Sequence, residues 1–185
     1  MTELGVRNKY VPDREVMEFC RRITGSWWGR QWLSGGEDTR LALFQIILDS
    51  GANTVRLDGE TFDKNGKLFG RWRSIAMGLR SRERTLLWAW EGTHPALAPG
   101  ETFAGFGHYT FDDATGIYER ADGQFADIQQ GRKKAVRWTS VQLRRVDIAD
   151  LERITRVMKS GSDSARAAEV IKAIDRFTRA GGQGI

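Results

Sequence analysis

Tryptophan is unusually frequent in this 185-residue sequence, which contains seven copies. They fall mostly in pairs or close together on segments with strand character: Trp27, Trp28, Trp32, Trp72, Trp88, Trp90 and Trp138. Large aromatic side chains fill the interior of small barrels, and their flat faces also stack on planar ligands such as purine bases and haem. The tryptophans therefore indicate either a tightly packed core or a binding site for a flat molecule.

Arginine and tyrosine side chains near these tryptophans are candidates for holding a phosphate-bearing ligand, because the guanidinium fork pairs with phosphate oxygens. We predict a ligand-binding site at a barrel mouth formed by Trp90, Tyr109, Tyr118, Arg120, Arg73, Arg137 and Trp138. The aromatic rings would stack on bases, and the arginines would reach phosphate. Strand alternation sets one condition: if Trp72, Trp88 and Trp90 face the lumen, Arg73 points outward. Tyr118 and Arg120, two residues apart, are expected to share a face.

Catalysis has weaker support in the sequence, and we predict no catalytic residue, no metal and no cofactor. His108, Glu119, Asp122 and Asp127 could place an acid and a base on one hairpin, but His108 alternates with Tyr109 and faces the other way. With one cysteine and two histidines, a cysteine-based zinc cluster is excluded. Cys20 lies on the apolar stripe of a helix and is expected in the core. His94, in a loop, is the candidate for an axial haem ligand.

The elements that must position these residues are mainly strands. Eight extended segments are separated by turn residues rich in glycine, asparagine and aspartate: 25–33, 41–50, 54–63, 67–78, 84–91, 101–111, 115–127 and 134–146. Helical periodicity appears at 12–24 and again after Asp147, with a break at 159–162. We predict a mainly β fold: an eight-stranded antiparallel meander barrel, calycin-like, with one N-terminal helix and two C-terminal helices.

Three parts follow along the chain: an N-terminal arm and helix over 1–24, a β-barrel domain over 25–146, and C-terminal helices with a frayed tail over 147–185. The helix expected at 163–180 carries an apolar line through Val170, Ile174 and Phe177. Such stripes commonly pair, so we expect a homo-oligomer formed through the C-terminal helices. No window approaches 18 uninterrupted apolar residues, which predicts a soluble cytoplasmic protein without a transmembrane segment.

Two resemblances sharpen the function. Gly25, Ser26 and Trp27, after a short helix, resemble the opening of lipocalin-type calycin barrels. The segments 87–95, 105–112 and 116–127 together resemble the ligand-sensing β-barrel of SMODS-associated antiphage effectors. That family recognises cyclic oligonucleotide signals in CBASS-type bacterial defence, and the resemblance covers about residues 25–146. Its barrels usually follow membrane-spanning segments, which this sequence lacks, so the resemblance implies a soluble sensor of the signal or a protein that sequesters it.

The net charge of the chain and the charge of the lumen distinguish a cyclic nucleotide sensor from the alternative functions. The formal net charge is +5, and residues 129–185 carry 13 Lys/Arg against 6 Asp/Glu. A small anionic ligand, such as a cyclic nucleotide, is therefore the expected partner, and we do not expect nucleic acid. The alternatives are a lipocalin-like carrier of an apolar or haem-like ligand and a barrel isomerase or cyclase. Buried cations are costly unless paired, so a carrier of apolar ligands should lack them in its lumen.

Overall fold

The computed structural model describes residues 14–33, 39–49, 51, 54–95, 102–113, 115–128 and 137–180. Residues 1–13, with the predicted arm and the start of the predicted helix, lie outside the described residues. So do residues 129–136, between the last two strands, and residues 181–185, at the end of the chain. No helix in these ranges is both long enough and apolar enough to cross a bilayer.

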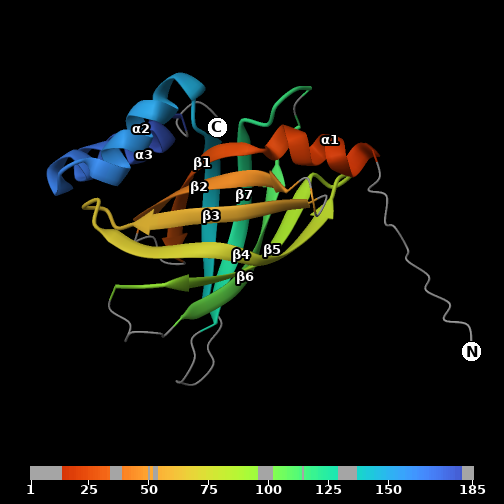
Figure 1. The fold of residues 1–185 in the computed structure, drawn as a ribbon, viewed down its shortest axis with the longest axis horizontal. Coiled ribbons are helices and arrows are strands. Elements are labelled where there is room, and N and C mark those ends of the chain that lie inside the picture. The colour runs from red at the N-terminus through yellow and green to blue at the C-terminus, as the bar shows by residue number, and fades with distance from the viewer. Residues whose placement is uncertain are drawn as a thin grey trace, which may run out of the picture.

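Eight antiparallel strands form a closed barrel, which confirms the predicted fold class (Figure 1). The strands are β1 (Gly25–Leu33), β2 (Thr39–Asp49), β3 (Thr54–Phe62), β4 (Leu68–Arg80), β5 (Thr85–Thr93), β6 (Phe103–Phe111), β7 (Arg120–Ile128) and β8 (Arg137–Arg145). Each strand pairs with the next in the chain, and pairing of β1 with β8 closes the sheet. Closure leaves no exposed strand edge, which is how a meander of short strands avoids edge-to-edge aggregation.

A β-bulge in β4 decides which of its residues face the lumen. The register with β5 shifts between Ser74 and Ala76, so Ile75 is the additional residue. Before the bulge Trp72 is buried in the barrel, whereas after it Met77 and Leu79 pack against the same core. A bulge adds one residue to one strand and thereby reverses the side-chain alternation beyond it.

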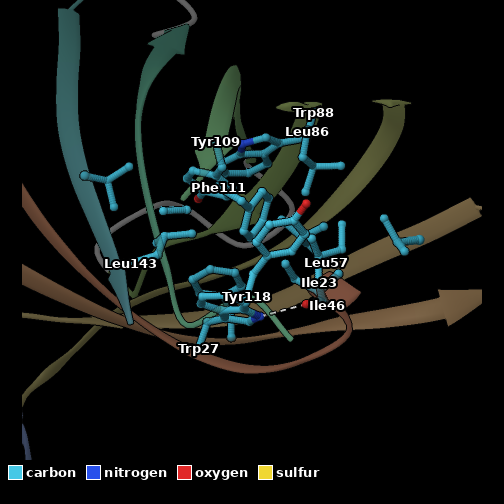
Figure 2. Close-up of a cluster of buried hydrophobic side chains, with 14 of the residues drawn as sticks. Ile23, Trp27, Ile46, Leu57, Leu86, Trp88, Tyr109, Phe111, Tyr118 and Leu143 are labelled. Atoms are coloured by element: carbon cyan, nitrogen blue, oxygen red, sulfur yellow. Dashed lines mark hydrogen bonds between the residues drawn. The ribbon is translucent and has the colours of Figure 1, made fainter. Parts of the chain in front are cut away.

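Helix α1 (Arg14–Ile23) packs against one end of the barrel and buries Phe19, Cys20 and Ile23. Trp27 lies beneath it, fully buried, and its indole N–H donates to the carbonyl of Ile23 over 3.0 Å. Figure 2 shows this bond as a dashed line within the buried cluster. Trp27 is therefore a packing residue at this closed end, and Cys20 is a core residue, as the sequence predicts.

Arg145, the last residue of β8, ties this end together. Its Nε donates to the carbonyl of Tyr118, its Nη1 to that of Thr24 and its Nη2 to that of Arg22, each over 2.6 Å. The guanidinium also lies 4.7 Å from the ring centroid of Trp27. One side chain thus joins the end of α1, the segment before β7 and the last strand.

Helices α2 (Ile148–Ser160) and α3 (Asp163–Ala180) cover part of the outer barrel wall (Figure 1). Asp147 caps α2, because its carboxylate accepts from the N–H of Ala149 over 2.9 Å. The second apolar cluster joins both helices to the strands and contains Trp28, Leu41, Phe62, Val146, Ile154, Met158, Val170, Ala173 and Phe177. The apolar line of α3 is therefore covered by the chain's own barrel. The expectation that this apolar line of α3 is free to pair with a second copy is therefore wrong. Whether the protein forms a homo-oligomer stays a prediction.

Candidate functional site: an aromatic cleft at the end of the barrel opposite helix α1

A cleft enters the lumen at the end of the barrel opposite α1. Its lining comes from seven strands, β1 to β7: Gln31, Arg40, Thr61, Phe69, Gly70, Trp72, Trp88, Trp90, Phe103, Phe125 and Asp127. Pockets for small molecules are mostly apolar and carry a few polar groups, and the lining of this cleft has that composition.

Tryptophan rings form the walls of the cleft. The ring centroids of Trp72 and Trp88 lie 5.1 Å apart, those of Trp88 and Trp90 6.1 Å apart, and Phe103 meets Trp90 edge-on at 5.0 Å. Trp88 and Trp90 occupy alternate positions of β5, so both point inward. Gly105, opposite Trp90 in β6, makes room for that ring, since a Cβ there would lie 2.7 Å from it.

Polar side chains lie at the rim of this aromatic cleft. Gln31 and Arg40 are register partners on β1 and β2. The Arg40 guanidinium stacks on the Phe69 ring, 3.6 Å from its centroid, and His94 meets the same ring edge-on at 4.3 Å. Partial burial, followed by the charges of Arg40 and Lys67, lowers the pKa of His94 below its ordinary value. The rim therefore favours a neutral imidazole beside a permanent cation.

Two indole N–H groups of the cleft have no acceptor among the residues that the structure describes. The N–H of Trp72 donates to the Thr61 hydroxyl over 3.2 Å. Trp88 and Trp90 are only 5% and 3% exposed, yet their Nε1 atoms are buried without a hydrogen-bond partner in the described part of the chain. A buried donor left unpaired costs about 1–3 kcal/mol, so each is an unusual feature that calls for an explanation.

The structure separates the aromatic members of the predicted site. Trp90 lines the cleft, and Tyr109 lies deeper in the lumen with its ring 5.4 Å from that of Trp88. Burial raises the pKa of Tyr109 far above its ordinary value, so its hydroxyl stays protonated. Tyr118 instead lies at the α1 end, packed against Phe19 and Phe111. In Figure 2, Tyr109 and Trp88 occupy one end of the cluster and Tyr118 and Trp27 the other.

Three other members of the predicted site lie on the outer wall, which corrects the expected grouping. Arg73 pairs with Glu91 over 2.7 Å, with its side chain 71% exposed. Trp138 is 44% exposed and rests edge-on against Phe106. Arg120 is also exposed. It does not share a face with Tyr118, because β7 begins only at Arg120 and the preceding segment is not a strand.

Arg137 is placed by its backbone alone. It is the first residue of β8 and pairs in register with Asp127, which lines the cleft. Its side chain lies outside the described residues. Its predicted role at the mouth therefore stays a prediction.

The candidate acid and base groups are not brought together in the lumen. His108 lies between the inward-facing Gly107 and Tyr109 on β6 and therefore points outward. Asp122 is also on the outer wall, where partial burial and the nearby Asp112 carboxylate raise its pKa. Among the described residues, no group of three His, Cys, Asp or Glu side chains is placed to hold a metal.

Five residues that the structure makes prominent, four at the rim of the cleft and Arg145 at the α1 end, are missing from the predicted site. Gln31, Arg40 and Asp127 form the polar rim with Thr61. A signal for Gln31 and Asp127 exists in the sequence, since they alternate in phase with the buried Trp27 and Phe125 on their strands. For Arg145 the equivalent signal is strand alternation, because it lies two and four residues after the buried Leu143 and Val141 on the same strand.

No protein-family model matches this sequence, and no curated protein matches it. The resemblance to CBASS-associated sensing barrels therefore stays a prediction. What the structure establishes is a closed β-barrel with an aromatic cleft at one end.

Proposed function

We propose that this protein is a ligand-binding barrel whose lumen holds a small, flat, largely apolar molecule. The observation that carries the proposal is the cleft walled by Trp72, Trp88, Trp90 and Phe103 at the end of the barrel that α1 does not cover. Aromatic faces stack on planar rings with little sequence or ligand specificity, and stacking contributes about 1–3 kcal/mol per ring. Such a cleft suits an aromatic or polyunsaturated ligand carried or sensed by the barrel.

The charges of the cleft favour this ligand over a cyclic oligonucleotide. Among the described residues that line it, one is basic and one is acidic, Arg40 and Asp127. A cyclic dinucleotide brings two phosphates, each of which needs cationic or backbone donors. Of the three arginines expected to supply them, Arg73 and Arg120 lie outside the barrel, and the side chain of Arg137 lies outside the described residues.

A cyclic nucleotide would therefore need a different site on this molecule. Arg120 and Arg144 are register partners on β7 and β8 and share the outer face. Two like charges directly opposite each other on a sheet repel, and a bound anion would relieve that repulsion. This pair gives the cyclic oligonucleotide hypothesis a position where it can be tested separately.

The experiment is a binding screen that follows the intrinsic tryptophan fluorescence. The panel contains naphthalene derivatives, haem, fatty acids and cyclic di- and trinucleotides. We expect a flat aromatic ligand to bind with a Kd below about 100 μM, which corresponds to about 5.5 kcal/mol. Gln31→Phe, which places a ring in the cleft, should abolish binding, whereas the outer-wall variant Arg73→Ala should leave it unchanged.

The proposal fails if none of the flat aromatic or apolar compounds binds below that threshold. It also fails if a cyclic nucleotide alone binds and Arg120→Ala weakens it tenfold while Gln31→Phe does not. That result would place the ligand on the outer wall and favour the antiphage sensor.

A further inference from the structure

We infer that the ligand of the lumen presents a neutral carbonyl oxygen to the indole N–H groups of Trp88 and Trp90, an inference that rests on the proposed function. Three buried side-chain polar atoms in the described part of the chain have no hydrogen-bond partner. Two of them are the Nε1 atoms of Trp88 and Trp90, and both residues line the cleft. The third, Arg30 Nε, belongs to a residue of β1 that alternates with the inward-facing Gly29 and Gln31.

Two other buried tryptophans, Trp27 and Trp72, show that this is not a general property of the barrel. Trp27 donates to the Ile23 carbonyl and Trp72 to the Thr61 hydroxyl. Trp88 and Trp90, at 5% and 3% exposure, lie between Trp27 at 0% and Trp72 at 9%, but nothing in the described protein accepts from them. Since buried donors are nearly always paired in folded proteins, an external acceptor is the explanation that the cleft offers.

An ordered water that accepts from both indoles would make two hydrogen bonds, the lower limit for a buried water, and would leave the apolar space between the rings unfilled. A buried water usually makes about three hydrogen bonds, and it needs two to four polar partners. The rings in contact with the two indoles are those of Trp72, Phe103, Tyr109 and Phe125, and the Thr61 hydroxyl already accepts from Trp72. A carbonyl oxygen attached to a flat ring system satisfies the donors while its rings fill the remaining apolar space.

Charge selects a neutral acceptor over a carboxylate. Indole N–H groups carry no net charge, and burying an ionised carboxylate without a cation is costly. The basic side chain that lines the cleft in the described structure, Arg40, is the second residue of β2 and stacks at the rim on Phe69. Trp88 lies at the middle of β5, in register with Met77 and Gly107. An aromatic ketone, aldehyde or quinone therefore fits better than an aromatic acid.

The test compares ligands that differ only in the acceptor. 2-Acetylnaphthalene and 2-isopropenylnaphthalene have the same shape, but the second carries a methylene group in place of the oxygen; 2-naphthoate carries the charge. We expect the ketone to bind at least tenfold tighter than the other two, a difference of about 1.4 kcal/mol. Titration of the wild-type protein, followed by fluorescence or calorimetry, needs no variant that could misfold.

Substitution then assigns the donors. Replacement of Trp88 or Trp90 by benzothienylalanine keeps the ring shape but exchanges the N–H for sulfur, and it should remove most of the preference for the ketone. The same replacement at Trp72, whose N–H is already bonded to Thr61, is the matched control and should retain the preference.

The outcomes separate the two claims. If none of the naphthalenes binds, and nothing else flat and apolar does, the proposed function fails. If the ketone and its hydrocarbon partner bind equally, the lumen site stands and the carbonyl inference is overturned. The inference is also overturned if naphthoate binds best, or if the preference for the ketone survives the replacements at both Trp88 and Trp90.

Discussion

Replacement of Arg145 by methionine should destabilise the fold, because Arg145 joins the elements at the closed end of the barrel. Methionine retains the apolar stem but removes three hydrogen bonds of 2.6 Å to main-chain carbonyls and the contact with the Trp27 ring. A hydrogen bond to a charged group contributes about 1.5–3 kcal/mol, but the guanidinium is only partly buried and water can reach some of the freed carbonyls. We therefore expect a loss of about 3–5 kcal/mol, a large share of the roughly 5–15 kcal/mol that stabilises a typical domain.

Urea denaturation, followed by tryptophan fluorescence and far-ultraviolet circular dichroism, measures this loss. With a slope of about 2 kcal/mol per molar urea, the midpoint should fall by roughly 1.5–2.5 M. Arg144→Met is the matched control, because Arg144 precedes Arg145 on β8, faces outward and contacts the Phe177 ring at 5.4 Å. It should cost about 1 kcal/mol or less, in line with a cation–π contact near the surface. If the two variants unfold within 1 kcal/mol of each other, the guanidinium of Arg145 does not hold the closed end together.

Three further predictions concern the core and the rim. Gly59→Ala should destabilise the fold by about 1–3 kcal/mol, since its Cβ would lie 2.5–2.6 Å from core side chains, whereas Gly116→Ala, with open space around it, should be neutral in the same urea assay. Cys20 is fully buried and its thiol pKa is raised by that burial, so it should react with an aromatic disulfide reagent only after unfolding; rapid reaction of the native protein would contradict its place in the core. The pKa of His94 is lower in the folded state than its unfolded value of about 6.5, so its contribution to stability is complete above pH 6.5 and is lost as the pH falls toward the folded pKa. His94→Gln should therefore lose less stability than the wild type between pH 7.5 and 5.5, and equal losses would refute the shift.

Local signals in the sequence determined the elements of this fold. Turn residues separate eight β-rich segments, and their number and order predict a meander whose ends can pair. The helical stripe around Cys20 and Ile23 likewise predicts a face that must be covered, and in the structure it covers the end of the barrel. The inward direction of Trp88 and Trp90, with Arg73 outside, follows from alternation alone.

Pairing between strands determined where strands begin and where bulges occur, and these set which side chains face the lumen. Tyr118 and Arg120 are two residues apart, but one is buried beneath α1 and the other exposed, because β7 begins at Arg120. At Ile75, likewise, a bulge changes which residues of β4 face the lumen, from even-numbered positions before it to odd-numbered positions after it. Strand starts and bulges depend on the neighbouring strands, so a single segment does not encode them.

Tertiary structure also decided which polar groups have partners. The sequence contains seven tryptophans with equivalent N–H groups. Only in the folded barrel does Thr61 lie beside Trp72, while Trp88 and Trp90 have no acceptor in the described part of the chain. The composition thus indicated a site for a flat ligand, and the unpaired donors, which arise from residues far apart in the chain, indicate the chemistry of that ligand.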